Sequence, residues 1–68
     1  MSTNDHLARM ANQIAANLAA QGEEAAIAET VEHLRRYWDP AMRASVMTVD
    51  PGSLSPIARA AMRRLARA

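Results

Sequence analysis

The break at Asp39-Pro40 constrains the fold most, because it directly follows the chain's two aromatic residues, Tyr37 and Trp38. Asp is a preferred helix N-cap, and proline is tolerated at the first helical position, where its missing N–H costs nothing. The pair therefore predicts the end of one helix and the start of another. Since an aromatic side chain can bury about 150–250 Å², we expect Trp38 to anchor the core at this corner.

The hydrophobic residues of the chain are mostly small. They make up 50% of its 68 residues, but many of them are Ala and none is Phe. In a chain of this size a single core rarely supplies more than about 3–5 kcal/mol. We therefore expect one domain in which helices pack closely over small side chains, and which depends on a partner for part of its stability.

The N-terminal half predicts two antiparallel helices. Apolar residues recur at helical spacing in the segments 5–21 and 23–38: Leu7, Ala11, Ile14 and Leu18 in the first, and Ile27, Val31, Leu34 and Trp38 in the second. Gly22, between them, is expected to take a positive φ and end the first helix. So short a connection predicts an αα-hairpin over residues 5–38 whose apolar stripes face each other, after an N-terminal tail of residues 1–4.

The C-terminal half, residues 39–68, predicts a pair of shorter helices. One runs from Pro40 to about Thr48, and the other from Pro56 to about Arg67 after a second cap-and-proline pair, Ser55-Pro56. Residues 50–53 (DPGS) are typical of a turn in which glycine takes the left-handed conformation. The residues expected to face inward are Met42, Val46, Ile57, Ala61 and Leu65, with Arg43 facing outward. The predicted fold is thus a single all-α domain, a small bundle of about four short helices.

Charge is unevenly distributed along the chain. Residues 1–32 carry one Arg and five acids, whereas residues 33–68 carry seven Arg and two acids. A basic half suggests nucleic acid, but a helix-turn-helix would begin its recognition helix with Glu23-Glu24, which would repel phosphates. A basic helix with few large apolar residues is also unlike a membrane-surface helix. We therefore expect neither nucleic-acid nor membrane binding.

Several other functional classes also lack support in the sequence. The chain has no Cys and no Lys, so disulfides, thiolate metal sites and lysine chemistry are excluded. Glu29 and His33, one helical turn apart, would supply only two metal ligands, and pairing on a helix surface is the better interpretation. No signal peptide and no apolar run of about 20 residues is present. A cytoplasmic, non-catalytic protein is expected.

Three segments together resemble a known family. They are residues 7–14 (LARMANQI), residues 33–43 (HLRRYWDPAMR) and residues 54–57 (LSPI) followed by Ala60. In this order and spacing they are similar to the delta subunit of soluble NAD-dependent formate dehydrogenases. The resemblance extends from Leu7 to about Leu65, nearly the whole chain.

The resemblance implies an accessory subunit of a cytoplasmic complex that oxidises formate to carbon dioxide and passes the electrons to NAD. In that family the alpha subunit carries a molybdenum or tungsten bis-pterin guanine dinucleotide and iron–sulfur clusters, and the beta and gamma subunits carry FMN and further clusters. The delta subunit would hold no cofactor and would support assembly, cofactor insertion or stability of the alpha subunit. The alternative is a free-standing helical regulator, homodimeric or bound to nucleic acid.

A partner surface is predicted where one edge of the first helix meets the corner at Asp39-Pro40. Methionines at the margins of the apolar stripes, including Met47, would adapt to a partner, with amides and arginines around them. The expected contact residues are Arg9, Met10, Asn12, Gln13, Arg36, Tyr37, Trp38, Asp39, Pro40, Met42 and Arg43.

Overall fold

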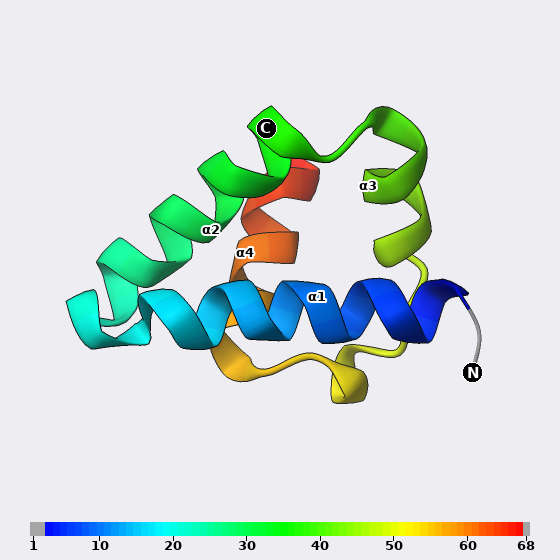
Figure 1. The fold of residues 1–68 in the computed structure, drawn as a ribbon. Coiled ribbons are helices and arrows are strands. Elements are labelled where there is room, and N and C mark those ends of the chain that lie inside the picture. The colour runs from blue at the N-terminus through cyan, green and yellow to red at the C-terminus, as the bar shows by residue number, and fades with distance from the viewer. Residues whose placement is uncertain (1–2, 68) are drawn as a thin grey trace.

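The computed structural model describes residues 3–67, and within them it contains four α-helices and no strand (Figure 1). The helices are α1 (Thr3–Leu18), α2 (Glu23–Tyr37), α3 (Pro40–Val46) and α4 (Pro56–Arg67). Two 3₁₀ turns, η1 (Ala19–Gln21) and η2 (Pro51–Ser53), precede α2 and α4. The predicted all-α fold of about four short helices is confirmed.

Several helix boundaries differ from the prediction. The first helix ends at Leu18 because residues 19–21 form the 3₁₀ turn η1, and α2 ends at Tyr37, one residue early. Polar side chains join two further points of difference, the start of α1 and the end of α3. Thr3 and Asn4, expected in a tail, belong to α1, whereas Met1 and Ser2 lie outside the described residues. The Asn4 amide donates to Thr48 Oγ1 at 3.0 Å, and the Thr48 hydroxyl donates to the Ser45 carbonyl at 2.7 Å. The Thr48 hydroxyl thus satisfies the Ser45 carbonyl in the last turn of α3, which ends at Val46.

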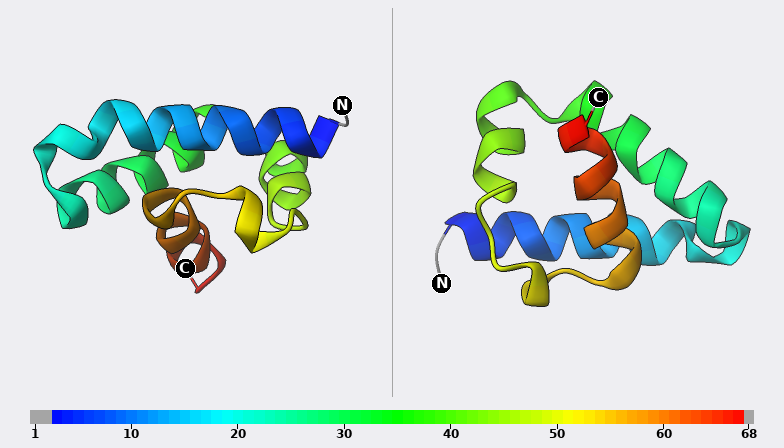
Figure 2. Two further views of the ribbon diagram at one scale, coloured as in Figure 1. Left: turned by 90° about the horizontal axis from the view of Figure 1, so that it is seen from below. Right: turned by 180° about the vertical axis from the view of Figure 1, so that it is seen from behind.

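The hairpin of α1 and α2 turns at Gly22, as predicted. Gly22 has a φ of 101°, a conformation that a residue with a Cβ adopts only with strain. The two helices meet at this end and separate toward α3, while α4 packs against both of them (Figures 1 and 2).

The apolar stripe of α2 is divided between two neighbours. Leu34, and Trp38 one helical turn later, join a cluster with residues of α1, α3 and α4. Ile27 and Val31 instead pack with Ala61 of α4. The expectation that the apolar stripes of α1 and α2 face each other therefore holds only for the C-terminal part of the α2 stripe, because α4 covers its N-terminal part.

Small side chains allow the helices to approach closely. Ala11, Ala26, Ala58 and Ala61 have no exposed surface. On α4, Ala61 is buried as predicted, together with Ala58 and Met62, whereas Ile57 and Leu65 are only half-buried, so the inward face is shifted to one side of the predicted one. The shift adds Ala58 and Met62 to the buried face and leaves Ile57 and Leu65 partly exposed.

The turn before α4 forms without a left-handed residue. Gly52 was expected to supply one, but Gly22 is the only residue with positive φ between residues 3 and 67. Instead, Asp50 Oδ1 accepts a hydrogen bond from the Gly52 N–H at 3.0 Å, and the Asp50 carbonyl accepts from Ser53 at 2.8 Å. The Asp50 cap and Pro51 at the first turn position therefore produce the 3₁₀ turn η2.

Candidate functional site

The corner between α2 and α3 is built around a buried tryptophan. Trp38 is 4% exposed and has extended backbone angles, so it lies just beyond α2 rather than inside it. Asp39 Oδ1 accepts from the Met42 N–H at 2.8 Å, and Pro40 occupies the first turn of α3. The predicted cap at Asp39-Pro40 is confirmed, and Trp38 contacts the core of this chain.

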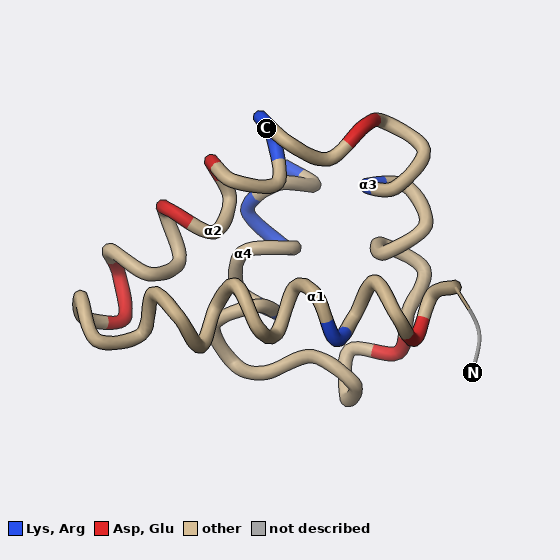
Figure 3. The backbone as a smooth tube through the Cα atoms, viewed as in Figure 1, with Lys and Arg blue, Asp and Glu red and all other residues tan. Residues whose placement is uncertain are grey.

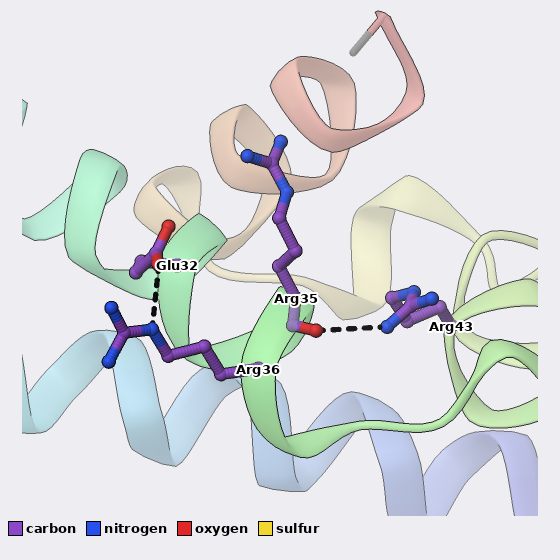
Figure 4. A network of polar contacts seen from close by, with 4 residues as sticks. All are labelled: Glu32, Arg35, Arg36 and Arg43. Carbon is purple, nitrogen blue, oxygen red and sulfur yellow. Dashed lines mark hydrogen bonds and ion pairs between the residues drawn. The ribbon is translucent and has the colours of Figure 1, made fainter.

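Arg43 closes the C-terminal end of α2 from the neighbouring helix. Its Nη1 donates to the Trp38 carbonyl at 2.6 Å. The same Nη1 donates to the Arg35 carbonyl at 3.2 Å, as Figure 4 shows. The last carbonyls of a helix have no partner within the helix, so a guanidinium placed there satisfies them and complements the helix dipole. The prediction that Arg43 faces outward is wrong, because this bonding draws the side chain back over α2.

Asn12 fixes the approach to α4 on the opposite side of the molecule. Its amide nitrogen donates to the Ser53 carbonyl at 2.9 Å, and its Oδ1 accepts from the Ser55 N–H at 2.8 Å. The Ser55 hydroxyl in turn accepts from Ala58 at 3.3 Å, which makes it the N-cap of α4. Arg9 and Gln13 lie beside Asn12 and line a shallow, open depression with residues 52–55.

The predicted contact residues of α1 do not share one edge. Met10 and Asn12 are two positions apart, which on an α-helix places them about 200° from each other. Met10 is half-buried against the main core cluster, as is Met42 of α3, whereas Asn12 faces the segment that leads into α4. Arg9, Asn12 and Gln13 therefore form one group, separate from the corner at Asp39-Pro40.

The last turns of α2 expose a second group that includes two predicted residues. Tyr37 is 70% exposed, and its ring lies 4.8 Å from that of His33, between centroids. Arg36 Nε pairs with Glu32 Oε1 at 2.8 Å (Figure 4). His33 thus contacts Tyr37, whereas surface pairing with Glu29 was the expectation. An exposed tyrosine beside an arginine has the composition of an interface hot spot.

A groove between α3 and α4 was not predicted from the sequence. We define the α3–α4 groove by its lining residues Val46, Met47, Val49, Pro51, Leu54, Arg59, Met62, Arg63 and Ala66. Its volume is about 440 Å³. Met47, 37% exposed, was the one sequence signal, since it lies at the margin of the apolar stripe of α3.

Four of the seven acidic residues lie on α2, which also carries Arg35 and Arg36, and four of the eight arginines lie on α4, which has no acidic residue. Figure 3 shows acids along α2 and arginines along α4. One ion pair joins the two helices, between Arg64 Nη2 and Glu24 Oε1 at 3.0 Å, and both side chains are well exposed. Among residues 3–67 no group of three His, Asp or Glu side chains could hold a metal ion. Every helix in that range is too short or too polar to span a lipid bilayer.

Comparison with known proteins yields one match. A family model described as the NADH-dependent formate dehydrogenase delta subunit FdsD matches residues 6–62. The matched range is well over half of the chain, and it contains the segments 7–14, 33–43 and 54–57. No curated protein and no solved structure matches the chain.

Proposed function

Because the chain belongs to the family of NADH-dependent formate dehydrogenase delta subunits, we propose that it acts as a non-catalytic accessory subunit of that enzyme. The family match over residues 6–62 carries this proposal. The bonding of three polar side chains supports it, because they bind the chain's own backbone. Asn12, Asp39 and Arg43 each bond main-chain groups of another segment or cap a helix.

The proposed partner is the alpha subunit, which by resemblance carries the molybdenum or tungsten bis-pterin guanine dinucleotide and iron–sulfur clusters. The beta and gamma subunits, with FMN and further clusters, would complete a cytoplasmic complex that passes electrons from formate to NAD. The whole chain has an accessible surface of 4215 Å². A standard interface covers about 800 Å² per partner, or about a fifth of this surface, so one partner would bury a large share of the chain.

The proposed role is to support assembly, cofactor insertion or stability of the alpha subunit. Two surfaces of the fold suit the binding that this role requires. One is the exposed Tyr37 beside Arg36, and the other is the apolar α3–α4 groove with Met47 at its edge. Such aromatic, methionine and arginine side chains are enriched at protein interfaces.

The role can be tested by expressing the alpha, beta and gamma subunits with and without this chain. We expect the complex made without it to oxidise formate with lower specific activity. A fall in the metal and pterin content per alpha subunit would indicate a role in cofactor insertion. A fall in the amount of complex recovered, with that content unchanged, would indicate a role in stability or assembly. Equal activity, loading and yield in the two preparations would contradict the proposal.

A further inference from the structure

We propose that the α3–α4 groove is the docking site for a segment of the catalytic subunit that presents large apolar side chains flanked by Asp or Glu. This inference rests on the proposed function and adds the surface and the chemistry of the contact. It is carried by the lining of the groove, by the way its walls are fixed, and by the charges at its rim.

The lining of the groove is apolar and includes an adaptable residue. Seven of its nine lining residues are aliphatic, methionine or proline, and two are arginine. Among residues 3–67, Met47 is one of two large hydrophobic residues that remain exposed. Methionine is flexible and polarizable, so it can repack against an incoming side chain. An apolar side chain seated here would cover Met47 and Val49.

The walls of the groove are held in place before any partner binds. Arg59 donates from Nε to the Pro51 carbonyl at 3.1 Å and from Nη2 to the Leu54 carbonyl at 3.0 Å, which joins α4 to the turn η2. Val46 and Leu54, at the inner side of the groove, are buried in the main core cluster. A preformed groove lowers the entropy lost on binding.

The charges at the rim favour an acidic segment. The only charged residues that line the groove are Arg59 and Arg63. Within the described part of the chain, the Arg63 guanidinium makes no ion pair, unlike that of its neighbour Arg64, which pairs with Glu24. Carboxylates on the partner would bond the free donors of these arginines around the apolar centre.

A second copy of this chain fits the groove poorly. Besides Met47 itself, Tyr37 is the large apolar side chain exposed among residues 3–67. Tyr37 follows Arg35 and Arg36 directly, so its insertion would bring arginines toward Arg63. Nucleic acid is also a poor fit, because phosphates would meet the arginines but leave Met47 uncovered. The observations therefore favour a partner segment that is both apolar and acidic.

Photo-crosslinking in the assembled enzyme tests the location. A p-benzoylphenylalanine at position 47 is expected to couple to the catalytic subunit, at a peptide that contains large apolar residues beside Asp or Glu. The control is the same probe at position 28, an exposed position on α2. Coupling from position 28 but not from 47, or coupling from 47 to a second copy of this chain, would overturn the inference.

A charge reversal at the rim tests the chemistry. Arg63→Glu should weaken binding to the catalytic subunit by about tenfold or more, because it places like charges together at the interface. The matched control is Arg64→Glu, the next residue of the same helix, which should change binding by less than about threefold because it loses an exposed ion pair. Both variants should keep the wild-type far-ultraviolet circular dichroism.

The outcomes separate the inference from the proposed function. If the wild-type chain binds the catalytic subunit but Arg63→Glu binds equally well, the groove assignment is wrong and the accessory role stands. If the wild-type chain does not bind the catalytic subunit, the proposed function itself fails. A third outcome is that the chain binds DNA in a salt-sensitive way and that Arg63→Glu abolishes this binding. The ligand of the groove would then be nucleic acid, and the inference would be overturned.

Discussion

Replacing Trp38 by Ala is expected to lower the free energy of unfolding by about 3–5 kcal/mol, the range for removing a buried aromatic side chain. Trp38 is 4% exposed and packs in the cluster that joins all four helices. A core of this size supplies about 3–5 kcal/mol in total, so the variant should be largely unfolded at 25 °C. Urea denaturation followed by far-ultraviolet circular dichroism measures the effect.

The adjacent aromatic residue is a matched control. Tyr37 precedes Trp38 in the sequence but is 70% exposed. Tyr37→Ala should therefore shift the free energy of unfolding by about 0.5 kcal/mol or less, as surface substitutions usually do. If Trp38→Ala unfolded at the same urea concentration as Tyr37→Ala, the assignment of Trp38 to the core of this chain would be wrong.

Replacing Arg43 by Met is expected to cost about 1.5–3 kcal/mol, the range for hydrogen bonds that involve a charged group. Methionine keeps much of the aliphatic stem but cannot donate to the Trp38 and Arg35 carbonyls, which Arg43 reaches at 2.6 and 3.2 Å. The end of α2 should then fray, and urea denaturation of the full chain measures the loss. The control is Arg35→Met, which removes an exposed arginine but leaves the Arg35 carbonyl in place.

The Arg43 variant also separates an internal role from a partner contact. If Arg43 acts within the chain, Arg43→Met should destabilise the free chain, and binding to the complex should weaken only as far as the folded fraction falls. Unchanged stability of the free chain together with weaker binding would instead assign the guanidinium to the interface.

The local signals in the sequence predicted the helices well. Caps and breaks act over a few residues, so Gly22, Asp39-Pro40 and Ser55-Pro56 each marked a helix boundary that the structure confirms. The stripe at Ile27, Val31, Leu34 and Trp38 is buried as its spacing indicated. Errors of a few residues at the starts and ends come from longer-range bonds, such as that between Asn4 and Thr48.

The arrangement of the helices was harder to predict, because periodicity gives the face of a helix that is buried but not what covers it. The stripe of α2 proved to be shared between α1 and α4. Alanine accounts for part of this difficulty, since a helix rich in Ala can bury several faces equally well. On α4 the predicted residue Ala61 is buried, but the buried face extends to Ala58 and Met62, whereas Ile57 and Leu65 are only half-buried.

The predicted contact residues also depended on distant pairings that the sequence does not reveal. Asn12 and Arg43 look like surface polar residues, but each bonds backbone groups of another segment. The α3–α4 groove is lined by two short helices about ten residues apart in sequence and by the segment between them, which Arg59 of α4 bonds at Pro51 and Leu54. Only Met47 indicated it beforehand.

Affinity purification of a tagged copy of the full chain from cells that express all the enzyme's subunits tests the central claim most directly. The proposal predicts that the chain is recovered bound to the catalytic subunit, with a native mass equal to the sum of the components and with formate-dependent reduction of NAD in the eluate. Recovery of the chain alone, as a homodimer or with nucleic acid, while the other subunits pass through unbound, would contradict it.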